Sequence, residues 1–101
     1  MDFDLIYCQD DNSAIGAGMA LKEAGLKDKV FVIGTDGSKD GLQAVKDGLI
    51  DRTSWKSARE EGYKAIEAAA MYLRGEAVEP IIELIQVEVT PDNVDSFEGE
   101  W

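Results

Sequence analysis

Histidine is absent from this 101-residue sequence, and cysteine occurs once. Without histidine the chain cannot build a Ser-His-Asp or Cys-His nucleophile system, and it lacks one of the commonest zinc ligands. A single cysteine excludes an internal disulfide, and no histidine base is present to activate the thiol of Cys8. We therefore expect this protein not to be an enzyme, and we expect no metal ion or cofactor.

Basic residues are scarce. Ten Lys and Arg face 21 Asp and Glu, which gives a formal net charge of −11. This balance argues against nucleic acid and against an anionic membrane surface as partners, because both require clustered positive charge. No apolar run approaches the roughly 20 residues of a membrane-spanning helix. No basic leader follows Met1, so we expect no signal peptide in this chain.

Short apolar runs indicate four strands. Residues 5–8 and 30–33 are continuous apolar runs, which are typical of parallel strands buried on both faces. Residues 50–55 form a weaker strand candidate, and residues 84–89 alternate between apolar and polar as an edge strand does. Helical patterns separate these strands. The order predicts an α/β fold with three layers, a mainly parallel β-sheet flanked by helices.

Three helices are predicted from apolar spacing and from their end signals. The first has Asp11 or Asn12 as its N-cap and ends at Gly25. The second covers residues 42–49. The third and longest begins at the capping box of residues 57–60, where serine is followed three positions later by glutamate.

Polar side chains gather where three of the predicted strands end. In open parallel sheets, ligands bind in the crevice at the carboxyl ends of the strands. Carboxylates there accept charge-assisted hydrogen bonds from vicinal hydroxyls, and an indole can cover the C–H face of a sugar ring. An ammonium group can neutralise a nearby carboxylate or contact an acidic group of the ligand. The candidate ligand-binding residues are Gln9, Asp10, Asp36, Trp55 and Lys56.

Several of these residues also have a purely structural interpretation. Asp36 and Gly37 form a dipeptide that is common in turns, and Trp55 can be a core residue. Asp11 and Asn12 can both serve as helix caps. We assign Asp11 and Asn12 to the start of the helix and Asp10 to the crevice.

The linked motifs resemble a known family. The string IYCQDDNSAIGAGMALKEAGLKDKVFVIGTDGSKDGLQAVKDGLID is similar to the second lobe of type I periplasmic sugar-binding proteins, the ribose-binding-protein group of ABC-transporter receptors. That family has Gln-Asn-Asp after one strand, Ala-Leu-Gly-Ala in the following helix and Gly-Phe-Asp-Gly after the next strand. Here the corresponding residues are 9–11, 14–17 and 34–37.

The resemblance implies roles for three of the candidate residues. Asp10 falls where the family has a sugar-contacting Asn, Asp36 falls on its ligand-binding Asp, and Lys56 falls on its hydroxyl-reading Gln. Asp10 and Lys56 are departures that change charge, and they can compensate each other as a pair across the cleft. The ligand therefore stays open between a sugar, a polyol, a sugar acid and an amino-sugar-like molecule.

The resemblance also implies a function and a context. We expect the solute-binding component of an ABC-type sugar transport system, which holds carbohydrate between two lobes, works with an ABC transporter permease and resides in the periplasm or at the cell surface. Family members are about three times as long. We thus expect residues 1–101 to be a single α/β domain from the C-terminal half, with helix 57–74 packing on the opposite lobe after a hinge near Lys56. We expect weak or no binding by this chain alone, possible self-association, and a loose tail at residues 91–101.

Two alternatives remain at this point. The effector-binding domain of lactose-repressor-type transcription regulators shares the fold, although those domains usually place Val-Pro where this chain has residues 27–29. A phosphoacceptor receiver domain also has an acidic pair after a strand, as in residues 10–12. For a receiver, however, Asp36 comes too early to be the phosphoacceptor, and Asp51 begins a strand instead of ending one.

Overall fold

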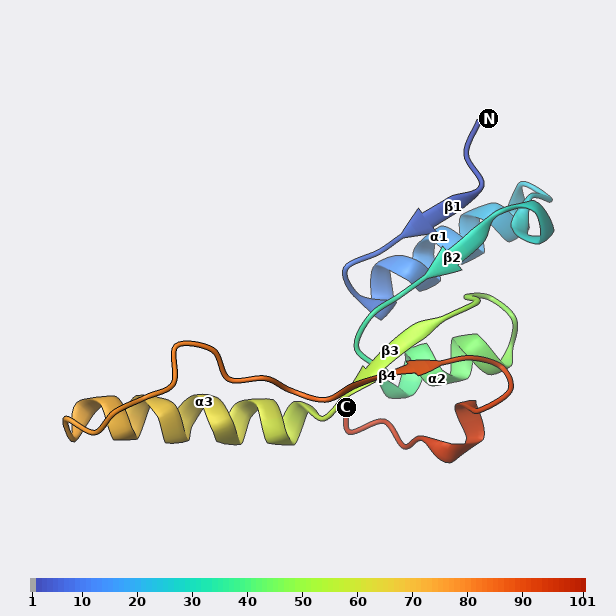
Figure 1. The fold of residues 1–101 in the computed structure, drawn as a ribbon. Coiled ribbons are helices and arrows are strands. Elements are labelled where there is room, and N and C mark those ends of the chain that lie inside the picture. The colour runs from blue at the N-terminus through green and yellow to red at the C-terminus, as the bar shows by residue number, and fades with distance from the viewer. Residues whose placement is uncertain (1) are drawn as a thin grey trace.

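The computed structural model describes residues 2–101 (Figure 1). Strands and helices alternate along the chain, as the hydrophobic pattern predicts. The elements are β1 (Leu5–Tyr7), α1 (Asp11–Glu23), β2 (Phe31–Ile33), α2 (Lys39–Lys46), β3 (Thr53–Lys56), α3 (Ala58–Leu73) and β4 (Gln86–Val89), with 3-10 turns at Lys27–Lys29 and Val94–Ser96.

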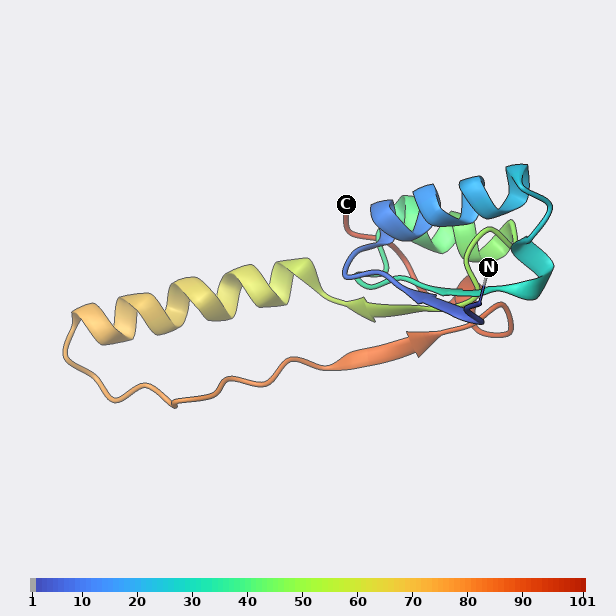
Figure 2. The same ribbon diagram turned by 90° about the horizontal axis from the view of Figure 1, so that it is seen from above.

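The strands lie in the spatial order β1-β2-β3-β4. β1 pairs in parallel with β2, and two isolated parallel bridges, Ile33 to Arg52 and Asp36 to Trp55, connect the β2 side to β3. This arrangement confirms the predicted mainly parallel α/β fold. The fourth strand differs, because β4 pairs antiparallel with β3. After α3 the chain turns back beside that helix and enters β4 from the opposite end (Figure 2).

Helices α1 and α2 lie on the same face of the strands (Figure 2). The other face is open within residues 2–101, where Leu5 is 49% exposed and Tyr7 is 66% exposed. Phe31 of β2 is exposed on the same strands, whereas Val32 is completely buried. The prediction that the first two strands are buried on both faces is therefore wrong for this chain, because helices cover one face only.

The core lies between the two helices and the strands. Gly18 lets α1 approach the loop after α2, since a Cβ atom at this position would collide with the main-chain oxygen of Leu49. Burial of apolar side chains is the main stabilising contribution here. The buried apolar residues are Ala14, Leu21, Val30, Val32, Leu42, Ala44, Val45, Ile50, Val89 and Val94.

The N-cap of α1 is Asp10, which corrects the prediction of Asp11 or Asn12. One Asp10 carboxylate oxygen, Oδ1, accepts a hydrogen bond from the Ser13 amide at 2.7 Å. At the start of α3, Ser57 accepts from the Glu60 amide at 3.1 Å, as predicted. In a capping box the glutamate side chain would in turn accept from the Ser57 amide. Here the Glu60 carboxylate pairs instead with the Lys64 ammonium group one turn later.

Helix α3 and the segment that returns beside it project away from the other elements (Figures 1 and 2). Its predicted apolar stripe is exposed, including Tyr63, Ile66 and Leu73. The returning segment exposes Ile81 and Ile85 as well, and the Lys64 ammonium group donates to the Glu83 carbonyl at 3.2 Å. Neither α3 nor any other helix within residues 2–101 has the length and apolarity that a membrane crossing requires.

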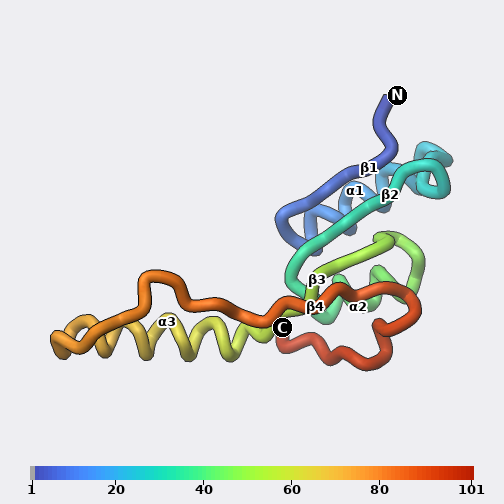
Figure 3. The backbone as a smooth tube through the Cα atoms, viewed as in Figure 1, coloured from blue at the N-terminus to red at the C-terminus, as the bar shows by residue number. Residues whose placement is uncertain are grey.

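Residues 91–101 differ from the expected loose tail. This segment runs past α2 and ends near the start of α3 (Figure 3). Val94 is buried in the core, and Phe97 packs on Trp55 with ring centroids 5.9 Å apart. The amide of Lys39 donates to the carbonyl of Trp101 at 2.8 Å. Two apolar residues three positions apart thus anchor a segment that is otherwise polar.

Candidate functional site

The carboxyl ends of β1, β2 and β3 lie at one edge of the strands. Gln9 and Asp10 follow β1, Asp36 follows β2, and Lys56 is the last residue of β3. The structure brings Asp36 and Lys56 together, with the ammonium nitrogen 3.9 Å from Oδ1 of Asp36. We call the four residues Gln9, Asp10, Asp36 and Lys56 the rim.

The backbone at Asp36 is strained. Its φ of 123° lies in a region that favours glycine. Hydrogen bonds to β3 hold this conformation, because the Asp36 amide donates to the Ser54 carbonyl at 2.9 Å and the Asp36 carbonyl accepts from the Lys56 amide at 3.3 Å. The following Gly37 lies so close to Trp55 that a Cβ atom would be 2.6 Å from its ring. These contacts therefore fix the backbone of Asp36 beside β3.

The electrostatic environment of Asp36 is mixed. Burial raises the pKa of the Asp36 carboxyl above its ordinary value, and the charge of Lys56 partly opposes this shift. The carboxylates of Asp11 and Asp10 add to the rise in pKa, whereas the Asp11 amide opposes it. Asp36 is thus a partly desolvated acceptor, and its hydrogen bonds are worth more than those of a fully hydrated carboxylate.

Lys56 has two carboxylate partners. Its ammonium nitrogen lies 3.1 Å from Oε2 of Glu61 in the first turns of α3 and farther from Asp36. Asp10, which we expected as a possible charge partner, is not among its ion pairs. Lys56 therefore links the rim to α3, and this link was not foreseen from the sequence.

Asp10 and Gln9 occupy the β1 side of the rim. Asp10 is half-buried and binds Ser13 twice, through Oδ1 to the amide and through Oδ2 to the hydroxyl at 3.0 Å. Its carboxylate keeps further lone pairs for another donor. Gln9 is exposed. Asp10 therefore combines a structural role in the helix cap with a position at the end of a strand.

Trp55 packs against the end of the chain. Its indole N–H donates to the Glu98 carbonyl at 3.0 Å, and its ring lies against Phe97 at an interplanar angle of 44°. These contacts match the structural interpretation of this residue. Its role as a platform for a sugar ring stays a prediction.

Asp11 starts α1 as predicted, but its role as a buried link between segments was missed from the sequence. It is 1% exposed and lies in the first turn of α1, where it connects three segments. Its carboxylate accepts from the Ser38 amide at 2.9 Å, the Ser38 hydroxyl at 3.1 Å and the Thr53 hydroxyl at 2.6 Å. Gly34 and Gly41 leave room for it, since a Cβ atom at either position would collide with the carboxylate. Gly34 and Gly41, on either side of Ser38 in the sequence, were the available signal that a side chain is buried there.

Cys8 directly precedes Gln9 of the rim. Burial and the charge of Asp10 raise the pKa of the Cys8 thiol, which disfavours the reactive thiolate. Within residues 2–101, no three His, Cys, Asp or Glu side chains are grouped so that they could hold a metal ion.

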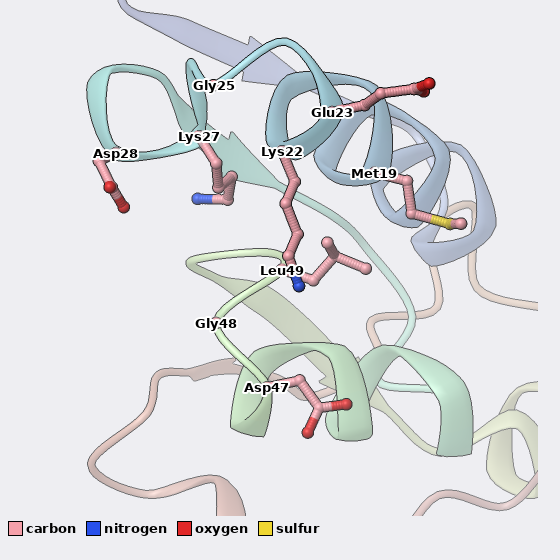
Figure 4. A pocket seen from close by; sticks show the side chains of 9 residues that line it. All are labelled: Met19, Lys22, Glu23, Gly25, Lys27, Asp28, Asp47, Gly48 and Leu49. Atoms are coloured by element: carbon pink, nitrogen blue, oxygen red, sulfur yellow. The ribbon is translucent and has the colours of Figure 1, made fainter.

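A separate concave surface lies at the C-terminal ends of α1 and α2 (Figure 4). Lys22 and Leu49 lie at its centre, with Met19 and Asp47 on opposite sides (Figure 4). Nearby Lys27 is already neutralised by Asp51 at 2.8 Å. This surface is at the far end of the helices from the rim, which makes it distinct from the candidate site.

Comparisons with known proteins agree with this architecture. Residues 2–77 match the periplasmic binding protein domain family. The chain is 41% identical over 78 residues to the ribose import binding protein RbsB of Salmonella typhimurium, which covers 77% of this chain and 26% of that protein. It is 37% identical over 92 residues to the xylitol-binding protein of Mycolicibacterium smegmatis, which covers 91% of this chain and 26% of that protein.

Solved structures give the same assignment. The crystal structure of an ABC transporter solute binding protein from Mycobacterium smegmatis with bound glycerol matches with a TM-score of 0.84 and 31% identity. The match covers 99% of this chain and 35% of that chain. This chain belongs to the periplasmic binding protein domain family.

The chain spans about a quarter to a third of the length of the curated relatives it matches. These relatives and structures are solute-binding proteins, so neither alternative from the sequence, the repressor-type effector domain or the receiver domain, gains support. Asp51, which the receiver hypothesis considered, has structural partners instead. Its carboxylate accepts from the Val32 amide at 2.7 Å and from Lys27.

Proposed function

We propose that this chain forms part of the carbohydrate-binding component of an ABC-type sugar transport system. It supplies one wall of a cleft, and the ligand is a polyhydroxylated molecule that is bound and released without chemical change. The observation that carries this proposal is the rim, where a strained and partly desolvated Asp36 lies beside Lys56 at the carboxyl ends of parallel strands. The names of the relatives support it, since they refer to ribose and xylitol.

The rim is suited to hydroxyl groups. A carboxylate such as Asp36 accepts two hydrogen bonds from adjacent hydroxyls, and each charge-assisted bond contributes about 1.5–3 kcal/mol. Lys56 can donate to a ring or hydroxyl oxygen while it stays close to Asp36 and Glu61. Asp10 and Gln9 supply further acceptors and donors from the β1 side.

We propose further that the rest of the protein covers the surfaces that this chain leaves open. The bare face of β1 and β2, including Tyr7 and Phe31, would receive the remaining part of the same lobe. Helix α3 would pack through Tyr63 and Ile66 on the opposite lobe. Residues 1–101 are then one α/β domain from the C-terminal half of a two-lobed receptor that works outside the cytoplasm with an ABC permease.

Isothermal titration calorimetry tests the binding function, and it requires the complete protein that contains this chain. The panel is ribose, xylitol, glycerol, myo-inositol, glucuronate and glucosamine. We expect a dissociation constant of about 1 μM or lower for at least one member, which corresponds to roughly −8 kcal/mol. Asp36→Ala should weaken that binding by at least about a hundredfold, because two charge-assisted hydrogen bonds are lost.

The matched control is Asp28→Ala, which removes an exposed carboxylate at the far end of the helices. It should leave the dissociation constant unchanged. No heat of binding for any panel member, or equal affinity for Asp36→Ala and the unsubstituted protein, would contradict the proposal.

A further inference from the structure

The last residues of the chain contact the end of β3 and the start of α2, next to the rim. The Glu98 carbonyl accepts from the indole of Trp55, and the Trp101 carbonyl accepts from the amide of Lys39 in the first turn of α2. Between them, Gly99 lies so close to Lys39 that a Cβ atom would be 2.5 Å from its main-chain nitrogen. The segment 98–101 is therefore seated between the end of β3 and the start of α2.

Glu100 extends these contacts to α3. Its Oε2 accepts from the Arg59 amide at 2.8 Å, and its Oε1 accepts from the Ser57 hydroxyl at 2.8 Å. Hydrogen bonds from the Arg59 amide and the Ser57 hydroxyl hold the pKa of the Glu100 carboxyl below its ordinary value, which shows that both favour the charged form. A carboxylate at a helix N-terminus also interacts favourably with the helix dipole.

These contacts bracket Lys56. Residue 55 before it and residue 57 after it are both bound by the segment 98–101. On the neighbouring strand end, Asp36 is followed three positions later by Lys39, which the segment also binds. Lys56 thus lies at the junction between β3 and α3, which residues 98–101 hold in place. From this junction its ammonium group reaches Asp36 and Glu61.

We propose that residues 98–101 form a positioning strap, in which Glu100 holds the first turn of α3 so that Lys56 stays beside Asp36. Glu100 is a positioning residue, since it acts on the rim through Ser57 and Lys56. The relevance of the strap to ligand binding rests on the proposed function. The contacts of residues 98–101 with Lys39, Trp55, Ser57 and Arg59 do not depend on that function.

Glu100 is the residue of the strap that can be removed selectively. Glu98 and Trp101 act through main-chain carbonyls, which a side-chain substitution leaves intact. Glu100 acts through both carboxylate oxygens. Glu98→Ala is therefore a matched control, because it removes a carboxylate two residues away without removing a strap contact.

The first test uses the full 101-residue chain and requires no ligand. Amide hydrogen exchange follows Arg59, and carbon-13 NMR follows the titration of Asp36. In Glu100→Ala we expect Arg59 exchange to be at least about tenfold faster, since a charge-assisted hydrogen bond is lost. We also expect the Asp36 pKa to rise further, because Lys56 opposes the rise caused by burial, Asp10 and Asp11.

Glu100→Gln should lie between the unsubstituted chain and Glu100→Ala, because its amide oxygen still accepts one hydrogen bond. It decides the question if Glu100→Ala fails to fold. An Asp36 titration in Glu100→Gln and Glu100→Ala that equals that of Glu98→Ala would overturn the strap.

The second test measures binding of the same six-member panel to the complete protein and follows the member that binds most tightly. We expect Glu100→Ala to weaken binding by about three- to tenfold, and Glu98→Ala to leave it unchanged. Sugar binding that is insensitive to Glu100, together with an unchanged Asp36 titration, rejects the strap and leaves the receptor function standing. A shifted Asp36 titration without sugar binding in any variant keeps the strap and rejects the receptor function.

Discussion

Replacing Asp11 with alanine should destabilise the chain more than any other single substitution at the start of α1. The carboxylate is 1% exposed and accepts hydrogen bonds from the Ser38 amide, the Ser38 hydroxyl and the Thr53 hydroxyl. In Asp11→Ala the buried Ser38 amide loses its acceptor, and the Thr53 hydroxyl must find a new one. These two losses cost about 1–3 kcal/mol each, so we expect a total of about 2–6 kcal/mol.

A loss of this size is a large part of the 5–15 kcal/mol that stabilises a typical domain. Urea unfolding, followed by circular dichroism and tryptophan fluorescence, measures it. With a slope of about 1–3 kcal/mol per molar urea, the midpoint should fall by about 2 M, or the variant should be unfolded without denaturant.

Two further variants test the reasoning. Asp11→Asn keeps the size and one acceptor oxygen but presents an amide N–H₂ group toward buried donors, so it should lose about 1.5–3 kcal/mol. Asp10→Ala removes only a helix cap and should lose about 1 kcal/mol. A loss below about 1 kcal/mol in Asp11→Ala, or a larger loss in Asp10→Ala, would refute the view that Asp11 is the buried link between α1, the loop before α2 and β3.

Four other substitutions have expected outcomes. Folding raises the pKa of the Asp36 carboxyl, so the native state binds its proton more tightly than the unfolded chain does. Above the raised pKa, the ionised carboxyl therefore lowers the stability of the folded chain. Below the ordinary pKa of 3.8, the carboxyl is protonated in both states and has no such effect. Asp36→Asn should therefore raise the melting temperature at pH 7 and leave it unchanged at pH 3, and a decrease at pH 7 would contradict the pKa direction. Asp36→Gly should relieve backbone strain at φ 123° and stabilise the chain by about 1 kcal/mol in urea unfolding. Gly18→Ala should lower the free energy of unfolding by about 1–3 kcal/mol, because the new Cβ atom meets the Leu49 carbonyl. Gly16 faces open space on the same helix, so Gly16→Ala should raise the free energy of unfolding by about 0.5–1 kcal/mol. Equal effects of the two substitutions would refute the close approach at Gly18.

Local signals in the sequence predicted most of the elements. Apolar runs and helical spacing gave the order of strands and helices, and Ser57 was correctly placed as a cap. Glycines at the predicted helix ends have positive φ, as at Gly25 and Gly75. Strands that run in parallel must end at the same edge, so the neighbourhood of Asp36 and Lys56 could also be predicted from the order of elements alone.

The identity of the helix cap could not be predicted, because either of two adjacent aspartates can cap a helix. Asp10 takes the cap, and Asp11 is turned inward by donors 27 and 42 residues away in sequence. The direction of β4 depended on the return of the chain beside α3, and no periodicity within β4 encodes that direction.

The sequence by itself determined the α/β class, the position of the strand ends and the family to which the chain belongs, because these follow from short-range patterns and linked motifs. Only the tertiary structure decided which carboxylate is buried, which acids neutralise Lys56, and how residues 98–101 hold Trp55, Lys39 and the start of α3. The physical reason is that a hydrogen bond or ion pair depends on distance and burial in space. Residues that meet only after folding leave no periodic signal along the chain.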